Sequence, residues 1–179
     1  MSGINASVIG VRVGTDHAEP DWYTLWCDHG DGPNRIVTRD GRMQWSSTLD
    51  GARALSAHLQ GPVSISPGEL DGVCDIAWAL YEISNLSSGN EMVVVLCLNL
   101  LDDMLVTVDH PLLEEPKLRL DRLTGRLIEG VSLPDAVAAQ GGASAVVEAV
   151  LASVGRVFVW SDFAADRAPP AMQSPSSAP

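Results

Sequence analysis

The chain has 179 residues, of which 46% are hydrophobic, and its formal net charge is −12. This length and composition are enough for one domain with a buried core, and they exclude a disordered polar chain. The negative charge disfavours nucleic acid and anionic membranes as partners and favours basic proteins.

The N-terminal part of the chain predicts antiparallel strands. Residues 4–13 alternate loosely between apolar and polar side chains, and the run that begins at Trp22 is rich in aromatic residues that favour strands. Asp40-Gly41 separates two further short apolar runs. This pair predicts a two-residue hairpin turn, because both central positions of such a turn need positive φ.

Three helices are predicted next. Ser46, Ser47 or Thr48 would cap the first helix, with Asp50 in its first turn, and this helix would end near His58. Residues 60–68 predict a loop. The second helix is expected from about Glu69 to Leu86 and the third from about Asn90 to Val108, where Pro111 follows.

The C-terminal part is less regular. Residues 117–130 predict either a hairpin about Thr124-Gly125 or a helix, whereas Ser132 with Pro134 predicts the start of a further helix. Residues 143–154 predict another helix and residues 156–160 a closing strand.

The expected fold class is therefore α+β. N-terminal antiparallel strands, including a hairpin, come first. A helical layer with a buried central helix and a late C-terminal strand follow. Residues 1–165 are expected to form a single domain, and residues 166–179, rich in Pro and Ser, a disordered tail.

The distribution of charge is the most unusual feature of the sequence. Between Ala54 and Pro116 there are ten acidic residues and no Lys or Arg. With helical spacing, Asp71, Asp75 and Glu82 fall on the face of the second helix opposite its apolar residues, with Trp78 beside them. We expect this acidic face to bind a cationic partner; the alternative is a solvated face whose Trp78 packs beneath a neighbour.

The third helix predicts a buried element, because apolar residues surround most of its axis. Its narrow polar strip includes Asp102, Asp103 and Asp109. Three interpretations remain open: the carboxylates bond neighbouring backbone, line a pocket with His110, or bind a hard cation such as Mg²⁺. The Asp-Asp pair is similar to that of metal-binding DDxxD helices, but the spacing to Asp109 differs. No metal and no cofactor are therefore predicted.

The three cysteines form no CxxC pair and predict reduced, buried thiols in a cytoplasmic protein. Cys27 and His29 could share one face of a strand, as a nucleophile and its base would. Acidic neighbours would raise the pKa of that thiol, however, so no catalytic residue is predicted.

Three functions follow as hypotheses. The first is a cytoplasmic binding protein that neutralises a basic protein, as an immunity protein or antitoxin does with a bacterial toxin. The second is a small enzyme or metal-binding protein with a carboxylate pocket around Asp102, Asp103 and His110. The third is a self-associating module, such as a homodimer, whose interface would include tryptophans of the first half of the chain: Trp22, Trp26, Trp45 and Trp78. No apolar run is long enough to predict a membrane span.

Overall fold

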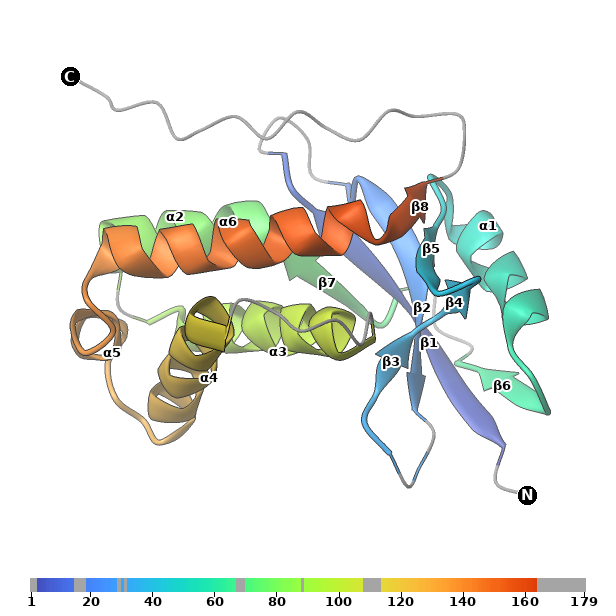
Figure 1. The fold of residues 1–179 in the computed structure, drawn as a ribbon, viewed down its shortest axis with the longest axis horizontal. Coiled ribbons are helices and arrows are strands. Elements are labelled where there is room, and N and C mark those ends of the chain that lie inside the picture. The colour runs from blue at the N-terminus through green and yellow to red at the C-terminus, as the bar shows by residue number, and fades with distance from the viewer. Residues whose placement is uncertain are drawn as a thin grey trace.

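The computed structural model describes residues 3–14, 19–28, 30, 32–66, 70–87, 89–107 and 114–163. Two sheets and a group of helices make up this part of the chain (Figure 1). Strands come first, several helices follow, and a short strand comes late. This order confirms the predicted α+β fold class.

The larger sheet is built around β1 (Ile4–Arg12). On one edge β1 pairs antiparallel with β2 (Trp22–Asp28), and β2 pairs with β3 (Arg35–Ile36). On the other edge β1 pairs parallel with two short strands in succession, β6 (Val63–Ile65) and β7 (Gly72–Asp75). Both predicted N-terminal strands are therefore confirmed, whereas β6 lies in a segment that was predicted to be a loop.

The smaller sheet joins distant parts of the chain. β4 (Thr38–Arg39) and β5 (Arg42–Trp45) form the predicted hairpin. Asp40 and Gly41 at its turn have φ of 53° and 75°, as this type of turn requires. β8 (Ser161–Phe163) then adds to β5 in parallel.

A short helix covers one face of the larger sheet. α1 (Leu49–Ala54) continues into a 3₁₀ turn, η1 (Leu55–His58). The hydroxyl of Thr48 caps α1 by accepting a hydrogen bond from the N–H of Gly51 at 3.1 Å. Both the predicted cap and the predicted end near His58 are confirmed.

The other helices gather on the opposite side of the larger sheet from α1 (Figure 1). They are α2 (Ile76–Asn85), α3 (Glu91–Thr107), α4 (Glu114–Ile128), α5 (Leu133–Ala138) and α6 (Ala143–Val159). α3 packs against α2, α4 and α6 and against strands β3 and β7. It is therefore the central helix of this layer.

Alternation along the strands gives the larger sheet two apolar faces. Val8 and Leu25 belong to the cluster on the side of α1. Ile9, Val11 and Trp22 belong to the larger cluster, which fills the space between the sheet and the helices. The sheet is thus a central layer with helical cover on both sides.

The start of the second helix was predicted too early. The chain forms β7 over residues 72–75, and α2 begins only at Ile76. Val73 is exposed and Cys74 is buried, which is the alternation of a strand. The side chain of Asp75 caps the helix by accepting a hydrogen bond from the N–H of Trp78.

The predicted strand at residues 156–160 is wrong. Residues 156–159 continue α6, because Val150, Val154 and Val157 keep the helical spacing of its buried side. The strand follows as β8. Residues 117–128 are helical, which decides between the two predictions for that segment, and Ser132 caps α5 as predicted. The tail, residues 166–179, lies outside the described residues.

Candidate functional site

Asp75 is held by its own chain at the junction of β7 and α2. Its Oδ1 accepts a hydrogen bond from the Trp78 N–H at 2.9 Å. The carboxylate also accepts a hydrogen bond from the guanidinium of Arg12. This bond to Asp75 is the main reason that the pKa of Arg12 is raised. Only 13% of the Asp75 side chain is exposed. Its charge is therefore compensated within the fold.

Glu82 lies inside the protein. Its side chain is 2% exposed, and Oε1 accepts a hydrogen bond from the amide of Asn90 at 3.1 Å. Oε2 is buried and has no hydrogen-bond partner among the described groups. Glu82 therefore joins α2 to the start of α3 and does not reach the surface.

The outward acidic face predicted from Asp71, Asp75 and Glu82 is wrong. Asp71 and Asp75 precede α2, so helical spacing does not apply to them, and Glu82 points toward α3. Asp71 is exposed and accepts a hydrogen bond from the Ser66 hydroxyl at 3.2 Å. Asp71, Asp75, Trp78 and Glu82 were predicted to bind a partner, and this role stays a prediction. Only Asp71 and Trp78 of these four are exposed.

Five apolar side chains form an exposed surface on α2 and α3. Their exposed fractions lie between 38% and 65%. The rings of Trp78 and Tyr81 have centroids 6.3 Å apart. We call this surface the α2–α3 face; it consists of Trp78, Tyr81, Met92, Val93 and Leu96.

The two helices that carry the α2–α3 face pack against each other. Glu82 on α2 bonds Asn90, which lies just before α3. The sulfur of Cys97 on α3 contacts Cys74 of β7, immediately before α2. The face is therefore divided between two neighbouring helices.

The elements that carry the α2–α3 face bear only negative charges. Between Gly72 and Thr107 the sequence has five carboxylates and no Lys or Arg. Hydrogen bonds, including one from the Gly89 N–H at 2.9 Å, lower the pKa of Glu91 beside Met92. This carboxylate is thus ionised at neutral pH, next to the apolar surface.

Asp103 contacts the sheet. Its Oδ2 accepts a hydrogen bond from the indole of Trp26 at 2.7 Å. Burial raises the pKa of Asp103 above its usual value, although the bond from Trp26 acts in the opposite direction. One turn on, the Thr107 hydroxyl accepts a hydrogen bond from the N–H of Ile36 at 2.8 Å. Asp103 and Thr107 thus fasten the end of α3 to β2 and β3.

Asp102 contacts α4 instead. Its Oδ1 accepts a hydrogen bond from Lys117 at 2.6 Å, and Lys117 also lies 3.1 Å from Asp121. Partial burial alone would lower the pKa of Lys117, but its bonds to the two carboxylates outweigh burial and raise it. We call these three residues the lysine triad. Its formal charge is −1.

The lysine triad lies along a groove between α3 and α4. The groove has a volume of about 260 Å³. Leu98, Leu105 and Ile128 contribute apolar walls, and Gly125 lines it without a side chain. We call this hollow the α3–α4 groove. Its size approaches the lower end of the range for small-molecule sites.

The predicted carboxylate pocket is not assembled by the residues described. Asp102 and Asp103 take part in separate contacts, with α4 and with the sheet. Asp109 and His110 lie outside the described residues, as does His29, the predicted neighbour of Cys27. Among the described His, Cys, Asp and Glu side chains, no three come together in a group that could hold a metal ion.

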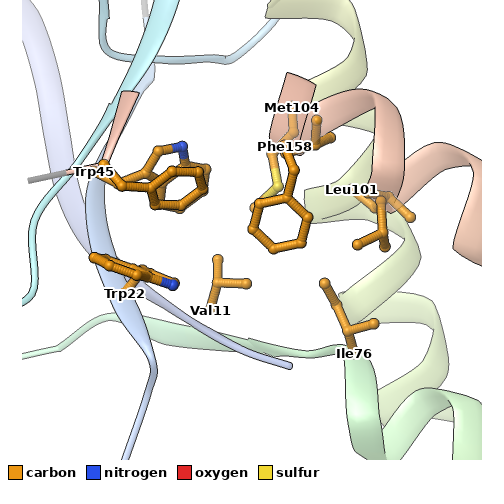
Figure 2. Close-up of a pocket in the computed structure, with 10 residues that line it drawn as sticks. Val11, Trp22, Trp45, Ile76, Leu101, Met104 and Phe158 are labelled. Carbon is orange, nitrogen blue, oxygen red and sulfur yellow. The ribbon is translucent and has the colours of Figure 1, made fainter. Parts of the chain in front are cut away.

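A small cavity inside the core is lined by apolar side chains of the sheets and helices (Figure 2). Its volume is about 10 Å³. The indole N–H groups of Trp22 and Trp45 have no hydrogen-bond partner among the described groups, and Figure 2 shows the Trp22 nitrogen directed toward Val11. A single water needs about 10–15 Å³, so no larger ligand fits.

No protein-family model, curated protein or solved structure matches the chain. Among the described helices, none has both the length and the apolar character needed to cross a membrane.

Sequence reasoning missed most of the α2–α3 face. The third helix was predicted to be buried because apolar residues, Val93 and Leu96 among them, surround most of its axis, so the exposure of Met92, Val93 and Leu96 was not predicted. Lys117 was also missed, although it is the only lysine in the chain.

Proposed function

We propose that the protein binds a basic protein partner through the α2–α3 face. The observation that carries this proposal is the exposure of apolar side chains on elements that bear no positive residue: Tyr81 is 59% and Met92 65% exposed, and residues 72–107 contain no Lys or Arg. Contiguous exposed apolar residues are typical of interaction sites.

The composition of the face supports a protein partner in particular. Trp and Tyr are frequent among the residues that dominate binding energies at interfaces, and Met is enriched there. The aromatic pair would supply an apolar anchor. The surrounding carboxylates and the net charge of −12 would speed the approach of a cationic partner and disfavour an acidic one.

We further propose that the partner is a toxin and that the protein is its cytoplasmic inhibitor, of the immunity or antitoxin kind. A stoichiometric inhibitor needs a binding surface and no catalytic centre. The separate contacts of Asp102 and Asp103 favour this proposal over an enzyme with a shared carboxylate pocket, within the part of the chain that is described.

The test begins with capture from the protein's own cell lysate by the tagged full chain, followed by affinity measurements on the purified partner. Trp78→Ala/Tyr81→Ala should weaken binding by about tenfold or more, as expected for interface anchors. Ile128→Ala is the matched control, because Ile128 is 65% exposed but lies on α4. Binding should also weaken as salt is raised.

Three results would count against the proposal. One is a captured partner that binds the double variant and the wild type equally. Another is an acidic partner. The third is self-association through the same residues in the absence of any other protein, which would point to a second copy as the occupant of the face.

A further inference from the structure

The core contains two cysteines in direct contact. The sulfur of Cys74 on β7 lies 3.4 Å from the sulfur of Cys97 on α3, and 3.6 Å from the Cys97 carbonyl oxygen. Both are free thiols, with exposed fractions of 0% and 1%. The contact is the junction between the larger sheet and the central helix.

We propose that Cys74 and Cys97 form an oxidisable dithiol that closes into a disulfide between β7 and α3. A disulfide bond is about 2.05 Å long, so the two sulfurs have to approach by little more than one ångström. Rotation of the side chains can supply part of this movement, because the sulfurs already face each other. This inference does not depend on the proposed partner.

The reaction is balanced with a peroxide as the oxidant. One thiolate attacks a peroxide oxygen, the O–O bond breaks, and a sulfenic acid and one water form from hydrogen peroxide. The second thiol then attacks the sulfenic sulfur, the S–O bond breaks, and a second water leaves as the S–S bond forms. Two thiol protons and two electrons pass to the peroxide, and a dithiol reductant reverses the cross-link.

The edge of the sheet provides the route to these buried sulfurs. β7 has four residues, and in the described structure its one strand partner is β1. Short edge elements open locally more readily than a whole domain unfolds. Opening of β7 would expose Cys74 while β1 and β2 stay paired.

The third cysteine provides an internal control. Cys27 is also buried, at 1% exposed, but its sulfur contacts the Leu25 carbonyl oxygen at 3.9 Å and belongs to the cluster on the other face of the sheet. Burial raises the pKa of Cys27 to about 11, and the contact with Cys74 raises the pKa of Cys97 as well, so the neighbouring sulfur and not the pKa distinguishes the two sites. A thiol with equal burial but no second sulfur beside it should stay reduced.

The experiment treats the purified full chain with hydrogen peroxide under native conditions. Remaining thiols are then alkylated with N-ethylmaleimide in denaturant, and peptides are analysed by mass spectrometry without reduction. We expect a peptide in which Cys74 is linked to Cys97, with Cys27 alkylated. Dithiothreitol should restore three alkylated cysteines.

Cysteine variants test whether the cross-link changes the thermal stability of the protein. Cys27→Ser should still form the linkage and should show the same upward shift in melting temperature on oxidation as the wild type. Cys74→Ser and Cys97→Ser should show neither. If either of these variants fails to fold, the peptide analysis of the wild type decides alone.

The proposal is overturned if Cys74 and Cys97 are both recovered alkylated after peroxide treatment, or if each carries its own sulfinic acid. It is equally overturned if the cross-link joins Cys27, or if linkage appears only at the rate of global unfolding measured in the same buffer.

Discussion

Two sides of α3 both carry large apolar residues, but one side is exposed and the other is buried. On one flank, Met92 and Leu96 are mostly exposed, and none of the described helices covers them. On the other flank, Leu98 and Leu105 are buried, and Asp102 is paired with Lys117 of α4. Hydrophobicity is alike on both, so composition does not decide which flank is buried. The neighbouring helix α4 decides it by covering one flank only.

The largest expected difference is between two leucines of α3. Leu101 is 1% exposed and Leu96 is 55% exposed. Leu101→Ala should lower the free energy of unfolding by about 2–5 kcal/mol, because it removes core packing and leaves a cavity. Leu96→Ala should change it by about 0.5 kcal/mol or less. Urea unfolding measures both, and equal losses would mean that the α2–α3 face is covered in solution.

A smaller effect is expected where α3 meets the sheet. Asp103→Ala leaves the Trp26 indole without its acceptor and should cost about 1 kcal/mol. Asp103→Asn keeps an acceptor oxygen and should cost less. Urea unfolding of the two variants at neutral pH compares the losses. If Asp103→Asn is as damaging as Asp103→Ala, the carboxylate charge is needed and not only the hydrogen bond.

The same contact predicts a pH dependence. Burial raises the folded-state pKa of Asp103 above its unfolded value, so protonation favours the folded state. The stabilising contribution is therefore complete below the unfolded pKa and is lost as pH rises through the folded pKa. Asn does not titrate, so Asp103→Asn should gain stability relative to the wild type as pH rises through this range. An opposite trend in urea unfolding would contradict the stated cause.

The α3–α4 groove can be probed at its glycine. A Cβ added to Gly125 would meet no atom within 4 Å apart from its chain neighbours and its own helix backbone, and Gly155 on α6 has the same property. Ala at either helix position should therefore raise stability by about 0.5–1 kcal/mol. Thermal unfolding compares the two. A loss at Gly125 alone would mean that the groove is narrower in solution.

The smallest effect is expected for the lysine triad. Lys117 and both carboxylates are a third or more exposed, so solvent screens the pairs. Lys117→Met should cost about 0.5 kcal/mol or less, and the cost should shrink at high salt. Arg119→Met, which removes one exposed pair with Glu115 on the same helix, is the control. A loss above about 2 kcal/mol would show that the triad is desolvated.

Local signals in the sequence were enough for the elements with side-chain caps or special turns. Three candidate caps that included Thr48 marked a helix start, Asp40-Gly41 marked a hairpin and Ser132 marked another helix start, because each acts on its own neighbours. The α+β order followed from these elements.

Signals failed where distant pairing decides the structure. Residues 72–75 have apolar spacing that suits a helix, but β1 pairs with them and makes them a strand. β-branched and aromatic residues at 156–160 predicted a strand, but the buried side of α6 extends through Val157. Two further features depend on how the helices pack against each other: the exposure of the α2–α3 face and the pairing of Asp102 with Lys117. The periodicity of a single helix carries no information about this packing.

The parallel pairing of β8 with β5 has a consequence for the order of folding. Met43 pairs with Ser161, so nearly the whole domain separates the partners in sequence. The β1–β2 pair and the β4–β5 hairpin join neighbouring segments and can form early. The chain entropy lost in closing so long a loop must be offset first by helix packing. During synthesis, the ring contacts of Phe163 with Trp22 and Trp45 can form only after α6 has emerged from the ribosome.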